Sequence, residues 1–134
     1  MKELSKKIGD MEFDGLVTDL TPRVQVRGGT IRKLATEATL ARGTVLAKSS
    51  GTAGDGKLVV LGTTAATNET LTPDCILCDD VVVGTAADVK VAVYTAGCFD
   101  PGKVTVATSY TVTAADYDAL RTRGIVFKAA APAG

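Results

Sequence analysis

The sequence predicts a small, mainly β protein with one short helix: a β-barrel or sandwich-like domain with an extended N-terminal arm. Short apolar segments, separated by turns rich in Gly, Asp and Thr, follow one another over residues 30–112, a pattern typical of compact β folds. A later segment has helix signals at both ends. The 134 residues suffice for one hydrophobic core. We therefore expect an arm over residues 1–29, flexible until bound, and a single β-rich domain over residues 30–134.

The arm is the segment whose role the sequence leaves open. Its five basic and five acidic residues cancel, and Gly9, Gly15 and Pro22 interrupt any long helix or strand. One alternative is an ordinary flexible terminus. The other is an extended segment that adds backbone hydrogen bonds to the sheet edge of a neighbour, with its apolar side chains in shallow pockets. In that case the binding residues are Ile8, Met11, Phe13, Leu16, Val17 and Leu20.

The predicted strands of the domain lie between turn-forming residues. The clearest is 89–94, whose valines share one face at a spacing of two residues. A glycine-rich loop with the turn pair Asp55-Gly56 joins two strands as a hairpin. In chain order, the expected strands are 44–47, 57–61, 75–83, 89–94 and, with weaker signals, 105–107.

The helix is expected within residues 113–128. Thr113 is placed as its N-cap, and Asp116 follows three residues later, near the positive end of the helix dipole. Gly124 is placed as a left-handed C-cap. A closing strand is expected at 125–127.

The composition argues against catalysis and several kinds of partner. Histidine, the commonest general base and zinc ligand, is missing, and no catalytic residue, metal, cofactor or small-molecule substrate is predicted. Fifteen basic residues balance 15 acidic ones, which argues against nucleic acid as the main partner. No stretch suits a signal peptide or a membrane helix. With an odd number of cysteines, three, the chain is expected to be assembled in a cytoplasm.

Cys75 and Cys78 form a C-x-x-C motif that can indicate redox chemistry or metal binding. Redox motifs of this type begin at a helix N-terminus, whereas the residues after Cys78 favour a strand, in which the two sulfurs would point to opposite faces. A zinc site would need a fourth ligand beside these two and Cys98. We therefore expect small, buried core residues.

Two further patterns have a conventional explanation. The loop over 51–57 resembles a phosphate-binding loop, but a strand rather than a helix follows its lysine. A hairpin connection is the favoured interpretation. The acidic residues at 79–80, Asp88 and Asp100 could bind a cation, but aspartates at strand ends usually form turns.

Taken in order, these features resemble the lambda-like bacteriophage head decoration proteins, also called capsid cement proteins. The most specific segment is a helix that runs into Arg-x-Arg-Gly-Ile and an apolar strand. The similarity covers residues 40–128 and lies in LARGTVLA (40–47), KLV (57–59), PDCILCDDV (73–81), VKVAVYTAGCF (89–99) and ALRTRGIVF (119–127).

The resemblance implies a structural virion protein. It implies a homotrimer on the outer surface of the expanded head, assembled in the host cytoplasm, whose N-terminal arms become ordered on the major capsid protein and extend a sheet there. The arm before residue 30 is longer than in the best-known member, and the cysteines are not family features. Two alternatives remain: another phage module, such as a tail tube or baseplate part, and a small thiol or metal protein that uses Cys75 and Cys78.

Overall fold

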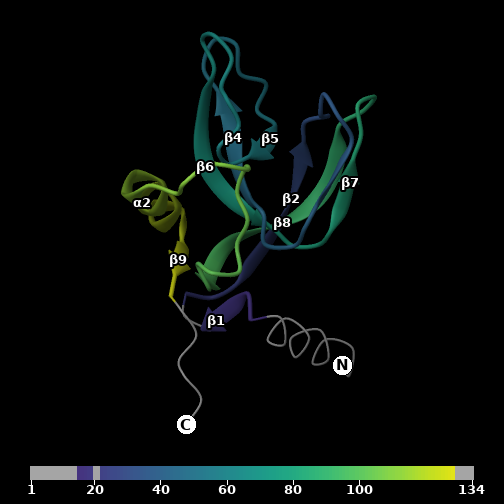
Figure 1. Cartoon of the computed structure of the whole chain (residues 1–134). Coiled ribbons are helices and arrows are strands. Elements are labelled where there is room, and N and C mark those ends of the chain that lie inside the picture. Colours follow the sequence, from purple (N-terminus) through teal and green to yellow (C-terminus); the bar gives the residue numbers. More distant parts are fainter. Residues whose placement is uncertain (1–14, 20–21, 129–134) are drawn as a thin grey trace.

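The structure, a computed structural model, describes residues 15–19 and 22–128. It is mainly β with a short helix, as the sequence predicts, and the order of the elements is shown in Figure 1. Among the described residues, no helix has the length and apolar character that crossing a membrane requires. The elements are β1 (Val17–Asp19), β2 (Gln25–Ile31), β3 (Ala38–Leu40), β4 (Val45–Ser50), β5 (Leu58–Val60), β6 (Thr70–Leu77), β7 (Val81–Val83), β8 (Val89–Phe99), α2 (Ala114–Arg123) and β9 (Ile125–Phe127).

Five strands close into a barrel. Their order is β8-β2-β5-β4-β6, and β6 pairs again with β8, so the ring has no open end. The pairs are antiparallel except β2 with β5, which run parallel and meet at Ile31 and Leu58. The glycine-rich loop joins β4 to β5 as the predicted hairpin, because these strands pair antiparallel on either side of it.

The long strand β8 continues beyond the barrel. Its first part pairs with β2 and β6, and its last part lies between β1 and β9. The change occurs near Gly97, which has a φ of 147°. A Cβ at this position would lie 2.9 Å from the ring of Phe99, so only glycine allows this close approach.

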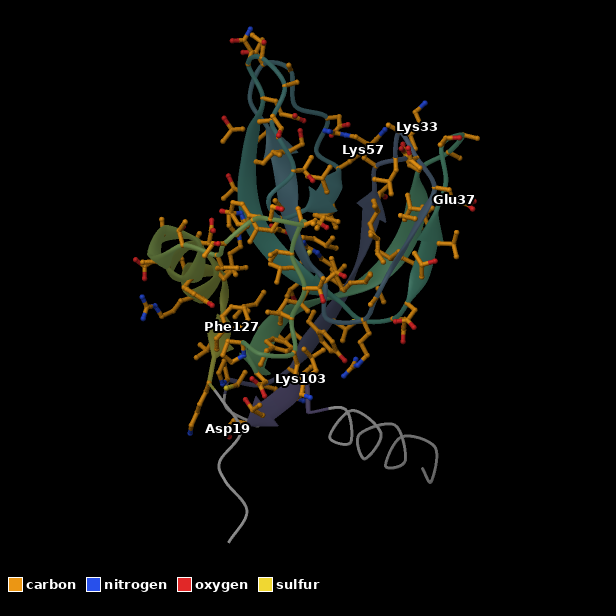
Figure 2. All side chains as sticks on the ribbon, viewed as in Figure 1. Asp19, Lys33, Glu37, Lys57, Lys103 and Phe127 are labelled. Carbon is orange, nitrogen blue, oxygen red and sulfur yellow. The ribbon has the colours of Figure 1, made fainter. Side chains whose placement is uncertain are left out.

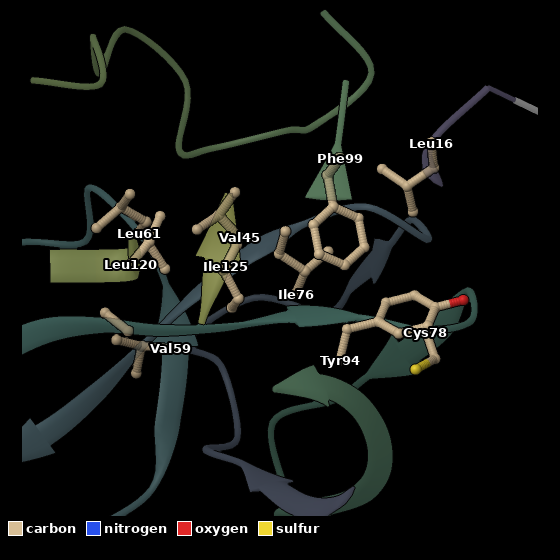
Figure 3. Packing of buried hydrophobic residues seen from close by; sticks show 11 residues of the cluster. Leu16, Val45, Val59, Leu61, Ile76, Cys78, Tyr94, Phe99, Leu120 and Ile125 are labelled. Atoms are coloured by element: carbon tan, nitrogen blue, oxygen red, sulfur yellow. The ribbon is translucent and has the colours of Figure 1, made fainter. Parts of the chain in front are cut away.

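Strand alternation creates two hydrophobic clusters on opposite faces of the same strands. The barrel cluster takes side chains from all five barrel strands and from the β3–β7 ribbon; its buried members are Ile31, Leu46, Leu58, Cys75, Leu77, Val83 and Val93. The outer cluster lies between β4, β5, β6 and β8 and the covering C-terminal segment. Figure 3 shows its buried members, which are Leu16, Val45, Ala47, Val59, Leu61, Ile76, Cys78, Tyr94, Phe99, Leu120 and Ile125.

The caps of α2 are those that the sequence predicts. The Thr113 hydroxyl accepts a hydrogen bond from the Asp116 amide at 3.2 Å, and the Asp116 carboxylate accepts one from the Thr113 amide at 3.0 Å. The Tyr110 hydroxyl donates to the same carboxylate at 2.5 Å. Gly124 ends the helix with a φ of 104°. The helix therefore begins and ends for local reasons.

Two strand predictions need correction. Segment 75–83 forms two strands rather than one, because Cys78, Asp79 and Asp80 leave the ladder between β6 and β7. Segment 105–107 forms only an isolated bridge between Thr44 and Thr105. The strands β1, β2 and β3 were not expected.

Candidate functional site

Both ends of the described chain lie side by side at one end of the molecule. The Thr18 hydroxyl donates to the Lys128 carbonyl at 2.8 Å, and the Lys128 amide donates to the Phe99 carbonyl at 2.9 Å. The Lys128 ammonium lies 3.5 Å from the Asp19 carboxylate. Figure 2 shows Asp19 and Phe127 at this end, far from Lys33, Lys57 and Glu37. The chain therefore enters and leaves the described fold at the same surface.

The structure describes two of the six candidate arm residues. Leu16 is 2% exposed and packs in the outer cluster, and its carbonyl accepts a hydrogen bond from the Asp100 amide at 2.8 Å. Val17 is half-buried in β1, opposite Phe99. These two side chains therefore contact the protein's own domain. The candidates Ile8, Met11, Phe13 and Leu20 lie outside the described residues.

The segment expected to be an arm contributes two strands to the fold. β1 pairs with the end of β8. Residues 25–29 form the first part of β2 and pair along β8. Within residues 15–19 and 22–128, no strand pairs with the second edge of β1. Strand addition uses a strand edge of this kind, on which no described strand pairs.

The cysteines are free and buried, as the sequence predicts. Cys75 belongs to the barrel cluster and Cys78 to the outer cluster, so their side chains point to opposite faces of the sheet. Burial raises the pKa of Cys75, and burial together with Asp79 raises the pKa of Cys78 to about 12. Little thiolate therefore forms at neutral pH. The thiolate is the form of cysteine that acts as a nucleophile or as a metal ligand.

Of the candidate acidic residues, Asp100 forms a turn, as expected, whereas Asp80 and Asp88 accept hydrogen bonds from distant parts of the chain. Asp80 accepts a hydrogen bond from the Arg42 amide at 2.7 Å, and Asp100 accepts one from the Gly102 amide at 2.8 Å. Asp88 is paired with the Lys57 ammonium at 2.5 Å. Within the described part of the chain, no group of three or more His, Cys, Asp or Glu side chains is placed to hold a metal ion.

A charged network at the other end of the barrel was not predicted. The Arg32 guanidinium donates to both oxygens of Asp55 at 2.9 Å and to Glu69 at 2.5 Å, and the Ser49 hydroxyl donates to Glu69 at 2.5 Å. The contact with Arg32 lowers the pKa of Asp55 to about 2, and the hydrogen bonds from the Ala66 amide, Ser49 and Arg32 lower the pKa of Glu69 to about 2. The partners of Arg32 lie 23 and 37 residues further along the chain, so no local sequence pattern reveals the network.

A second unexpected feature is a buried carboxylate. Asp74 on β6 is 3% exposed. Its oxygens lie 2.8 Å from the Arg123 guanidinium and 3.5 Å from that of Arg27. Both arginines remain substantially exposed. The arginine of the Arg-Gly-Ile segment thus ties the C-terminal end of α2 to β6.

The comparisons with known proteins give one clear result. No curated protein matches the sequence. The model of the family described as bacteriophage lambda head decoration protein D matches residues 14–125, from the residue before Gly15 to the first residue of β9. This span includes the barrel, the ribbon and α2, and the chain therefore belongs to the phage lambda head decoration protein D family.

Proposed function

We propose that this chain decorates the outside of the expanded phage head as a homotrimer and stabilises the shell. In this proposal the N-terminal arm adds to the major capsid protein. The family match supports a capsid-decorating role. The observation that supports the finer proposal is the edge of β1 on which no described strand pairs, at the surface where the described chain begins.

The geometry gives the arm a fixed starting point. Leu16 and Val17 pack against Phe99, so the described chain begins beside β1. An incoming strand of the major capsid protein beside β1, or the arm on that protein's sheet, would add backbone hydrogen bonds. Ile8, Met11, Phe13 and Leu20 are proposed to fill apolar pockets on the shell.

Stabilisation of the shell follows from linked contacts. A trimer that bridges several capsid subunits makes three arm contacts at once, and linkage raises the overall affinity far above that of one arm. Ordering each arm costs conformational entropy, which the backbone hydrogen bonds and the apolar contacts must exceed. No chemical step is needed, in agreement with the buried thiols.

Co-sedimentation with capsids tests the role directly. The purified full-length chain should bind expanded capsids of its own phage in multiples of three. Phe13→Asp should weaken binding without lowering the melting temperature, whereas Thr64→Asp, at an exposed position on another loop, should bind normally. A chain that ignores capsids and forms hexameric rings or tubes would overturn the proposal in favour of a tail module.

Hydrogen exchange tests the mechanism of the arm. Amides over residues 8–14 should exchange rapidly in the free protein and slowly on the capsid. Amides of β8 serve as the internal control, because their ladder is complete in the free protein. Equal protection of residues 8–14 in both states would contradict the arm mechanism.

A further inference from the structure

Two exposed aliphatic side chains lie on strand edges that carry opposite charge. The first surface, here called the basic edge, is residues 22–30 on and before β2. Val26 at its centre is 59% exposed. Arg23 and Arg27 flank it, both exposed, and the segment itself contains no acidic residue, although Arg27 also lies 3.5 Å from the buried Asp74 carboxylate. Within the described fold, residues 25–30 pair only with β8, so the second edge of this part of β2 is open.

The second surface, here called the acidic ribbon, is residues 37–40 and 79–84, which contain β3 and β7. Val82 is 57% exposed and lies opposite Thr39. The ribbon contains Glu37, Asp79 and Asp80, all exposed, and no basic residue. β3 and β7 pair only with each other in the part of the chain that the structure describes. Figure 2 shows Glu37 at the outer side of this ribbon.

The exposed Lys90 lines a surface pocket together with Asp79 and Asp80, but the three carboxylates of the ribbon outnumber this one ammonium, so the ribbon stays acidic. The Arg42 guanidinium, which follows β3, donates to the Cys78 carbonyl at 3.0 Å and to the Tyr94 hydroxyl at 2.5 Å, and lies over the Tyr94 ring at 5.4 Å. Arg42 is therefore directed at the outer cluster. The acidic side chains on either side of Val82 face solvent.

We propose that the acidic ribbon of one copy docks on the basic edge of the next copy, with Val82 against Val26. Each surface offers an apolar centre, an open backbone edge and charges that the other complements. Contact between two identical surfaces would instead bring like charges together, which is unfavourable. Complementary surfaces on different elements of one chain make a head-to-tail contact, and such a contact gives a closed ring of three when the rotation between neighbouring copies is about 120°, a third of a turn.

This inference rests on the proposed homotrimer and assigns the contact that builds it. It also accounts for the exposure of Val26 and Val82, which belong to neither hydrophobic cluster. In the assembled ring, both valines would be removed from water.

A charge exchange tests the contact. Val26→Glu would place a carboxylate against the acidic ribbon, and Val82→Arg would place a guanidinium against the basic edge. By light scattering behind a sizing column, the wild type should have three times the chain's 13.7 kDa. Each single variant should fall to the mass of one chain at the same concentration. The double variant should regain the wild-type mass, because the introduced charges then attract at every contact.

Ala65→Glu and Ala65→Arg, at an exposed position away from both surfaces, are matched controls and should leave the mass unchanged. Circular dichroism should show all variants folded. Single variants that keep the wild-type mass, a double variant no larger than the singles, or a wild type of one or two chains would each overturn the assignment. Capsid co-sedimentation is scored separately, so single variants that stay trimeric and bind capsids contradict this contact but not the decorating role.

Discussion

Asp74 illustrates how one buried charge joins distant parts of the chain. Its carboxylate is almost fully removed from water, and the two neighbouring guanidinium groups come from α2 and β2. A buried carboxylate without a cation loses its hydration and gains little in return. The exposed arginines remain hydrated when the carboxylate is absent. The two partners of this ion pair are therefore not energetically equivalent.

That asymmetry predicts unequal effects on the free energy of unfolding. Arg123→Met leaves the Asp74 carboxylate with only the more distant Arg27 and should destabilise the fold by about 1–3 kcal/mol. Asp74→Asn removes the charge and should be less destabilising. Urea denaturation at neutral pH measures both. Arg121→Met, which removes an exposed pair with Asp118, is the control, with an expected effect below about 1 kcal/mol. Equal losses for Arg123→Met and Asp74→Asn would contradict the argument.

The Arg32 network predicts sensitivity to acid. The pKa values of Asp55 and Glu69 fall from their ordinary 3.8 and 4.5 to about 2 in the folded protein. A carboxyl group with a lowered pKa stabilises the fold above its unfolded pKa, and this contribution is lost as the pH falls towards the folded pKa. Stability should therefore decrease between about pH 4.5 and pH 2, when measured as the urea midpoint.

The control for this prediction is a variant without the cation. Arg32→Met should be less stable than the wild type at neutral pH and should lose less stability on acidification. Lys48→Met, at an exposed position on β4, should keep the acid dependence of the wild type. An unchanged acid dependence in Arg32→Met would show that other carboxyl groups dominate.

At the scale of elements, local signals explain what the sequence predicted. The helix has both caps encoded within a few residues, and the β4–β5 hairpin has its turn residues between two apolar runs. The strand β2 was missed because Gly28 and Gly29 lower the strand signal and its partner β8 is far away in sequence. Burial of Asp74 and the contacts of Arg32 likewise depend on distant partners. These contacts join residues that are far apart in the sequence, so they follow from the folded barrel and not from any local sequence pattern.

The two glycines of β2 allow a matched test. A Cβ at Gly29 would lie 2.8 Å from a methyl group of the buried Leu58, whereas a Cβ at Gly28 would meet nothing within 4 Å. Gly29→Ala should therefore destabilise the protein by about 1–3 kcal/mol, because the barrel cluster must shift. Gly28→Ala should be neutral or slightly stabilising. Thermal melts of both variants measure this, and equal melting temperatures would contradict the barrel packing around β2.

At the scale of the whole molecule, different surfaces of the fold have different proposed partners. The end that joins β1, β8 and β9 is where the chain enters and leaves, and it is proposed to face the capsid. The basic edge and the acidic ribbon are proposed to face other copies. Assembly and capsid binding then depend on different residues, and affinity for the shell depends on both because the ring links three arms.

This division predicts how a monomeric variant binds capsids. Val26 lies in β2, and Val26→Glu leaves the proposed binding residues of the arm unchanged, but it should lose the ring, so each copy would bind through one arm alone. Its affinity for expanded capsids should fall by about 10²- to 10⁴-fold relative to the wild type, the usual gain from linked contacts. The double variant Val26→Glu/Val82→Arg should recover most of this affinity with no change in the arm. Capsid binding isotherms measured at equal chain concentration decide the matter. If the monomeric variant binds as tightly as the wild type, a single arm supplies the affinity and linkage of the arms is not the means of stabilisation.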